Sequence, residues 1–144
     1  MALQDLLLRI LIALLAGVLV GFERQWHHKS AGLRTNTLVA VGSAFYVILS
    51  VELTQYSGDV TRIIGQVVTG IGFLGAGIIF REGANVHGLT TAATVWCSSA
   101  IGCISGAGYL VEALIATATI LLVNVALVPI DNWLSTRKIK KENE

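Results

Sequence analysis

Apolar residues form five long runs along the chain, separated by short polar stretches. A helix that crosses the roughly 30 Å hydrocarbon core of a bilayer needs about 20 mostly apolar residues. The five runs approach this length and cover Leu3–Phe22, Thr35–Thr54, Ile63–Phe80, Leu89–Ser105 and Tyr109–Ile130. The pattern therefore predicts an all-α fold, a polytopic bundle of five transmembrane helices.

The ends of these runs carry recognisable signals. Gly106-Ala107-Gly108 joins the short fourth run to the fifth and predicts a tight turn. The single proline, Pro129, is expected to close the fifth helix, because a helix end tolerates proline. The first run lacks a preceding basic region and ends in Phe22-Glu23-Arg24 rather than at a small-residue cleavage site, so we expect it to be retained.

Composition supports a membrane protein. The chain is 54% hydrophobic and 13% charged, whereas soluble domains average about 45–50% apolar and 25% charged residues. No basic patch is interleaved with aromatic residues, so nucleic-acid binding has no support. The two cysteines, Cys97 and Cys103, would not share a helix face and are read as small apolar filler.

Positive charge gives the expected orientation, because cytoplasmic loops carry an excess of Lys and Arg. One side of the predicted bundle holds most of these residues: Arg24, Lys29, Arg34, Arg81, Arg137, Lys138, Lys140 and Lys141. We therefore expect the N-terminus outside and a basic cytoplasmic tail at residues 135–144.

The third run is rich in glycine. Each glycine costs a helix about 1 kcal/mol relative to alanine, a cost that close helix–helix approach offsets in lipid. We therefore expect this run to be a packing core. Gly17-x-x-x-Gly21 and Gly102-x-x-x-Gly106 are further close-approach motifs, facing either the same chain or another subunit. The predicted packing positions are Gly17, Gly21, Gly70, Gly72, Gly75, Gly77, Gly102 and Gly106.

The glycines do not predict a cofactor. Gly70-x-Gly72-x-x-Gly75 matches a dinucleotide fingerprint formally, but it lies inside an apolar run instead of between a strand and a helix. No serine, threonine or cysteine has a sequence-evident base partner. We expect neither a cofactor nor an enzyme activity.

Polar residues at the cytoplasmic ends of the runs are the candidate functional loops: Glu23, Arg24, Arg34, Thr35, Arg81, Asn85, Thr90 and Thr91. Glu23-Arg24 either anchors the first helix at the interface or turns inward to bind Arg34 or Arg81. The threonines stand at helix starts, where they either cap free N–H groups or join the arginines in an anion site.

Acidic residues within the runs are few. Glu23 at a run's edge and Glu112 near the outer end of the fifth run are the candidates for an ion path. Glu112 alternatively reaches the outer headgroups, and Asn124 is expected to make a polar contact between helices. Asp5 and Arg9 are spaced to form an i, i+4 pair. Whether a metal binds is left open.

The first two and the next two runs suggest an internal repeat. Six positions coincide at an offset of 56 residues, among them Gly32 with Gly88, Leu33 with Leu89 and Ser43 with Ser99. Such a duplication would relate two helical hairpins by a pseudo-two-fold axis along the membrane normal. Chance matches between apolar segments are the alternative explanation.

Four sequence blocks together resemble the MgtC/SapB family of bacterial inner-membrane proteins. They are Gly21-Phe22-Glu23-Arg24-Gln25, Ala31-Gly32-Leu33-Arg34-Thr35, the glycine block from Gly70 to Gly77, and Gly88-Leu89-Thr90-Thr91-Ala92-Ala93. The resemblance implies a family-type transmembrane domain at residues 1–134. It also implies a multi-pass location in the inner membrane and a link to magnesium-limited growth, acid stress and virulence. We expect the chain to lack the ACT-type C-terminal domain that some members carry and to be similar to the short members.

The residues favour a modulator over a transporter. Mg²⁺ prefers several oxygen ligands, whereas the predicted cytoplasmic loops are net basic. We therefore expect a non-enzymatic protein that acts in ion or acid-stress homeostasis through partner membrane proteins in the lipid bilayer. The alternatives are a magnesium or proton-coupled ion transporter that acts as a homo-oligomer, and a structural assembly factor.

Overall fold

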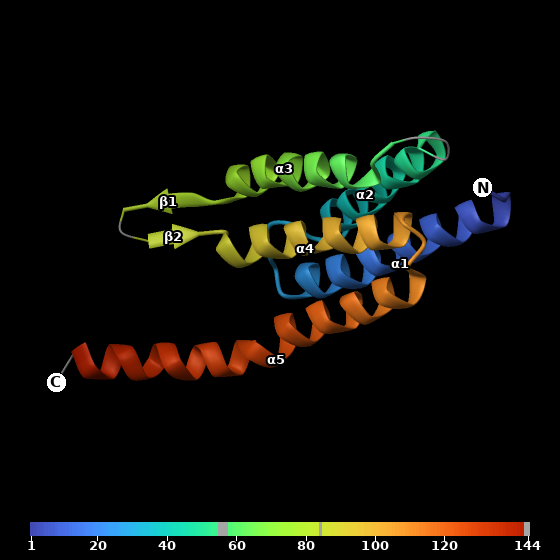
Figure 1. Ribbon diagram of the computed structural model, residues 1–144. Helices are drawn as coiled ribbons and strands as arrows, with labels where there is room; N and C mark the ends of the chain where they lie inside the picture. Colours follow the sequence, from blue (N-terminus) through green and yellow to red (C-terminus); the bar gives the residue numbers. More distant parts are fainter. Residues whose placement is uncertain (55–57, 84, 143–144) are drawn as a thin grey trace.

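The computed structural model is a bundle of five helices with one short hairpin (Figure 1). It describes residues 1–54, 58–83 and 85–142, with the backbone alone at 132 and 134–142. The helices are α1 (Leu3–Trp26), α2 (Leu33–Leu53), α3 (Val60–Ile78), α4 (Leu89–Gly106) and α5 (Leu110–Glu142), and the strands are β1 (Phe80–Glu82) and β2 (Asn85–His87). The predicted all-α class is confirmed.

Four of the helices are long and apolar enough to cross a membrane: α1, α2, α3 and the Leu110–Asp131 part of α5. The described helix α4 is not among them, because threonine, serine and glycine replace many of its large apolar residues. It is instead the helix enclosed by the others, and it packs against all four of them. The fourth predicted run is thus a helix, but a central and more polar one.

Glycines bring α1, α2 and α4 into close contact. A Cβ added at Gly17 would lie 2.7 Å from Thr37 Cα, and one at Gly21 would lie 2.7 Å from Leu33 Cα. Gly102 and Gly106 of α4 lie in the same way against backbone atoms of Ala40 and Ala44 in α2. The two small-residue motifs therefore face helices of the same chain, where any side chain would force the backbones apart.

The glycine-rich helix α3 lies at the edge of the bundle. A Cβ at Gly70, Gly72 or Gly77 would meet nothing within 4 Å, and one at Gly75 would only touch the Ala92 side chain at 3.8 Å. Gly75 is the one buried residue among those of α3. Within the chain, the expected helix packing of this run is therefore met only at Gly75, whereas the Cβ positions of Gly70, Gly72 and Gly77 have no neighbouring atom.

The sequence predicted that the fifth helix ends at Pro129, but α5 continues to Glu142. A proline inside a helix removes one hydrogen bond and kinks the helix without always stopping it. Figure 1 shows α5 changing direction about half-way along and extending beyond the bundle. The backbone of the predicted tail is helical as far as Glu142.

Candidate functional site

The last turn of α1 places a charged pair inside the bundle. Glu23 has 9% of its surface exposed and Arg24 only 2%. Arg24 continues the stripe of small buried residues that α1 presents to its neighbours, Ala13, Gly17 and Val20, at spacings of three and four. The helical period that buries this stripe therefore also turns Arg24 inward.

Glu23 connects α1 with α5. Its Oε2 accepts a hydrogen bond of 3.0 Å from Asn124 Nδ2, and its Oε1 lies 3.1 Å from His27 Nδ1. The same His27 nitrogen lies 2.9 Å from the Glu23 carbonyl oxygen. Because both of these oxygens are acceptors, Nδ1 must carry the proton. The exposed His27 thus covers the outer side of a buried carboxylate.

Arg24 connects α1 with α4. Its Nη2 donates to Thr91 Oγ1 at 3.2 Å, and its buried Nε has no hydrogen-bond partner among the described residues. Thr94 connects α4 with α5, since its hydroxyl lies 3.4 Å from Asn124 Oδ1. Polar contacts at this end of the bundle therefore join α1, α4 and α5, and they leave one guanidinium N–H unsatisfied.

A second polar network joins α2 and α4. The Asn36 side chain, 0% exposed, donates to the carbonyls of Ala31 and Gly32 and accepts from Ser98 at 2.9 Å. Seven residues further along α2, about two helical turns, the Ser43 hydroxyl lies 2.7 Å from that of Ser99. Asn36 was not predicted as a functional residue; its only signal in the sequence is an amide near the start of an otherwise apolar run.

The structure brings together only some of the predicted loop residues. Arg24 and Thr91 are in contact, whereas Arg34, Thr35, Arg81, Asn85 and Thr90 are exposed. Glu23-Arg24 does turn inward, but its partners are Thr91 and Asn124, and the prediction of Arg34 or Arg81 is wrong. Arg81 belongs to the β1–β2 hairpin, which extends beyond the ends of α3 and α4 (Figure 1), and Arg34 is exposed at the start of α2.

The threonines do not cap the helices as expected. The N-cap residues of α2 and α4 are Gly32 and Gly88, which have no side chain to accept a bond. Gly88 has φ +86°, a left-handed conformation suited to glycine. The Leu33 N–H of α2 instead donates to Gln25 Oε1 at 3.2 Å. This leaves Thr91 to accept its bond from Arg24.

The two candidate ion-path residues lie far apart. Glu112 is exposed in the first turn of α5, whereas Glu23 contacts Asn124, twelve residues further along the same helix. At 1.5 Å per residue this separation is about 18 Å. Within the described part of the chain, no group of three His, Cys, Asp or Glu side chains could hold a metal ion.

The opposite end of the bundle is held by Arg9. Its guanidinium pairs with Asp5 at 2.8 Å, as the i, i+4 spacing predicted, and donates to the Gly106 carbonyl at 2.8 Å. Ser105 donates to the Arg9 carbonyl at 2.7 Å. A cation at the carbonyl end of α4 also interacts favourably with the helix dipole, so this cluster joins α1 to α4 structurally.

Comparison with known proteins identifies the family. The sequence profile of the MgtC family matches residues 10–133, which include both polar networks. The chain belongs to the MgtC family. It is 53% identical to Protein MgtC of Brucella abortus (strain 2308) over 129 residues, 90% of this chain and 54% of that protein.

Other relatives agree with this assignment. Protein MgtC of Salmonella typhimurium (strain 14028s / SGSC 2262) is 52% identical over 84% of this chain and 52% of its own length. An uncharacterized protein of Synechocystis sp. is 48% identical over 92% of this chain and 56% of its own. The chain thus spans about half the length of these relatives. No solved structure matches significantly.

Proposed function

We propose that this MgtC-family chain is a non-enzymatic inner-membrane protein that modulates magnesium or acid-stress homeostasis through partner membrane proteins. The observation that carries the proposal is that the buried polar groups of the chain hold its helices together. Glu23, Arg24 and Asn36 are hydrogen-bonded to side chains of neighbouring helices. They act as joints of a helix assembly and do not converge as the several oxygen ligands that Mg²⁺ prefers.

Charge argues in the same direction. Glu23 is the one buried acidic residue among those described, and it is adjacent to the buried Arg24. A fixed cation beside the carboxylate opposes the entry of a divalent cation. The exposed surface of α3 supports a role in association, since its glycines leave the backbone open to a partner.

The test separates modulation from transport. The purified chain in proteoliposomes should show no Mg²⁺ or H⁺ flux above empty liposomes. In cells, Gly75→Leu should abolish the effect of the chain on growth at low magnesium, because a leucine there would push against Ala92 of α4 and reshape the α3 surface. Ala118→Leu on the exposed side of α5 is the control, since it adds a leucine to the surface of the bundle without changing α3. Loss of growth in both variants or in neither would contradict this interpretation.

A second candidate, an ion transporter that acts as an oligomer, is favoured by one contact. His27 is exposed and touches the buried Glu23, so the two could pass a proton between the surface and the bundle. Saturable flux in proteoliposomes that is lost in Glu23→Gln or Glu112→Gln would place that glutamate on a path and would replace the modulator proposal.

A further inference from the structure

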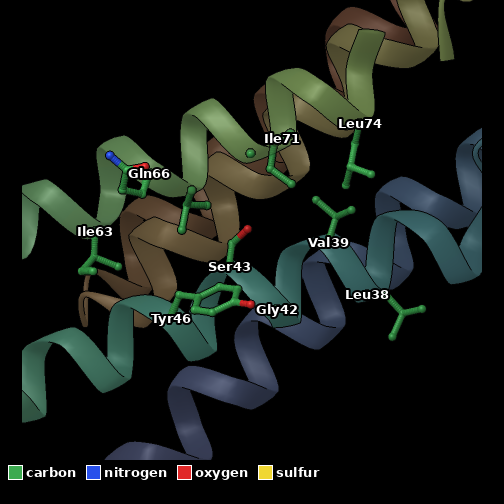
Figure 2. Close-up of a pocket in the computed structure, with 11 residues that line it drawn as sticks. Leu38, Val39, Gly42, Ser43, Tyr46, Ile63, Gln66, Ile71 and Leu74 are labelled. Atoms are coloured by element: carbon green, nitrogen blue, oxygen red, sulfur yellow. The ribbon is translucent and has the colours of Figure 1, made fainter. Parts of the chain in front are cut away.

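An apolar groove separates α2 from α3. It has a volume of about 600 Å³ and is lined mainly by aliphatic side chains of the two helices. Figure 2 shows Ile71 and Leu74 of α3 pointing toward α2, with Val39 of α2 pointing back at them. Gly42 and Gly70 also line the groove, and neither has an atom of another residue within 4 Å of its Cβ position. The groove is therefore open along its length.

A second cavity of about 400 Å³ continues the groove toward the end of α2 and the start of α3. The two share Tyr46, Ile63 and Gln66 as lining residues, so they form one channel along the helices. The lining of the second cavity is more polar and includes Ser50, Thr54, Asp59 and Arg62. The channel thus has an apolar body and a polar mouth.

The dimensions fit one leaflet of a bilayer. From Arg62 at the mouth to Leu74 at the far end the channel follows twelve residues of α3, about 18 Å of helix. Half of a bilayer hydrocarbon core is about 15 Å thick. Arg62 lies in the first turn of α3, so a membrane-spanning α3 would place the mouth near the interface and the apolar body toward the midplane.

The mouth carries an unsatisfied donor and two opposite charges. Ser50 is 4% exposed, and its buried hydroxyl has no hydrogen-bond partner among the described residues. Leaving a buried hydroxyl unpaired is costly. Asp59 accepts bonds from the Thr61 N–H and hydroxyl, which lower the pKa of its carboxyl. A carboxylate and the Arg62 guanidinium therefore stand together at the polar end.

We propose that the α2–α3 channel binds one phosphatidylethanolamine molecule. One acyl chain fills the apolar body, the phosphate contacts Arg62, and the ammonium faces Asp59. An ester oxygen at the glycerol accepts a hydrogen bond from Ser50. A flexible acyl chain can fill an irregular groove between the two helices. A zwitterionic headgroup pairs with both charges at the mouth, whereas an apolar helix of a partner would leave them unpaired.

The binding test uses native mass spectrometry. The full chain, released from mild detergent, is measured with phosphatidylethanolamine and phosphatidylglycerol of the same acyl chains. We expect one tightly retained lipid per chain, with phosphatidylethanolamine preferred. Arg62→Gln should weaken its retention about tenfold, because a hydrogen bond to a charged group is lost. Asp59→Asn should remove the preference between the two lipids.

Gly70→Leu tests the body of the channel, because its side chain would fill the groove. The matched control is Gly72→Leu, two residues away in open space and outside the groove. We expect lipid retention to be lost in Gly70→Leu and kept in Gly72→Leu. If Gly70→Leu does not give a monodisperse folded protein, Gly42→Leu fills the groove from the opposite wall.

Equal retention in the groove-filling variant and its control would mean that the lipid is only annular, and would overturn the proposal. Equal retention of both headgroups by the unmodified chain would also overturn it. The readout is lipid binding by the purified chain, so its failure leaves the proposed modulation of partner proteins untouched.

Discussion

At the residue scale, the central feature is the guanidinium of Arg24, which forms no ion pair with a carboxylate among the described residues. Arg24 is buried, donates to a neutral hydroxyl and keeps Nε unsatisfied among the described residues. The adjacent Glu23 directs its own oxygens to Asn124 and His27. A buried charge whose hydrogen bonds are incomplete is costly, and such costs are tolerated mostly at sites with a function.

Replacing Asn124 by alanine tests the joint between α1 and α5. The variant removes the donor to Glu23 Oε2, and hydrogen bonds between membrane helices contribute about 0.6 kcal/mol on average and at most about 2 kcal/mol. We expect the free energy of unfolding to fall by that order in a detergent-unfolding titration. Asn85→Ala in the exposed hairpin is the control and should change it little; an equal loss in both would argue against the joint.

Asp59 should make the start of α3 sensitive to acid. Its bonds from Thr61 lower the carboxyl pKa below the ordinary 3.8. A depressed pKa means that the stabilisation is fully present above pH 3.8 and is lost as pH falls through the lower, folded-state value. Hydrogen-exchange protection of the first turn of α3 should drop in that window. In Asp59→Ala the protection should be low at every pH; an unchanged acid transition there would show that another group is responsible.

At the element scale, the position of a glycine matters more than its abundance. The helix with the most concentrated glycines, α3, buries only Gly75, whereas Gly102 and Gly106 lie directly against the backbone of α2. In the sequence, α3 and α4 both read as helices rich in small residues. A small-residue motif does not show which face of its helix meets a neighbour. The helix starts agree with the repeat hypothesis, since Leu33 and Leu89 begin α2 and α4. The duplication itself stays a prediction.

Two alanine substitutions should separate the two kinds of glycine. Gly102→Ala places a methyl group against the Ala40 carbonyl and should destabilise the bundle by about 1–3 kcal/mol through overpacking. Gly72→Ala meets nothing and should stabilise α3 by up to about 1 kcal/mol through helix propensity. Thermal unfolding of both variants in one detergent checks the opposite signs. A loss of stability at Gly72 would reveal a contact of α3 outside the chain.

At the scale of the whole molecule, the chain has its termini at opposite ends of the bundle (Figure 1). Opposite ends agree with an odd number of crossings, but the direction of insertion comes from charge alone. The two sides of the bundle also differ in chemistry. Glu23 and Arg24 lie at one end of α1, and the Asp5–Arg9 pair lies at the other.

Cysteine labelling should fix the orientation. In a background with Cys97→Ser and Cys103→Ser, we introduce Lys29→Cys in the α1–α2 loop and Asp59→Cys before α3. The positive-inside rule predicts that an impermeant maleimide labels position 59 in intact spheroplasts and position 29 only after permeabilisation. The reverse pattern would invert the orientation, and labelling of both positions in intact cells would indicate mixed insertion.

The sequence by itself determined the helical class, the approximate limits of the first four helices and the family, but not the end of α5. These follow from hydropathy, turn glycines and local motifs, which act over one or two helical turns. The Asp5–Arg9 pair was predictable for the same reason, since its residues are four apart on one helix.

Only the tertiary structure decided which polar residues meet. The contacts of Arg24 with Thr91, Glu23 with Asn124 and Ser98 with Asn36 join residues 67, 101 and 62 positions apart. No local pattern encodes such distances, because they depend on how whole helices pack and rotate. The open face of α3 was decided in the same way: a glycine favours close approach, but the placement of the neighbouring helices determines whether one is there to approach.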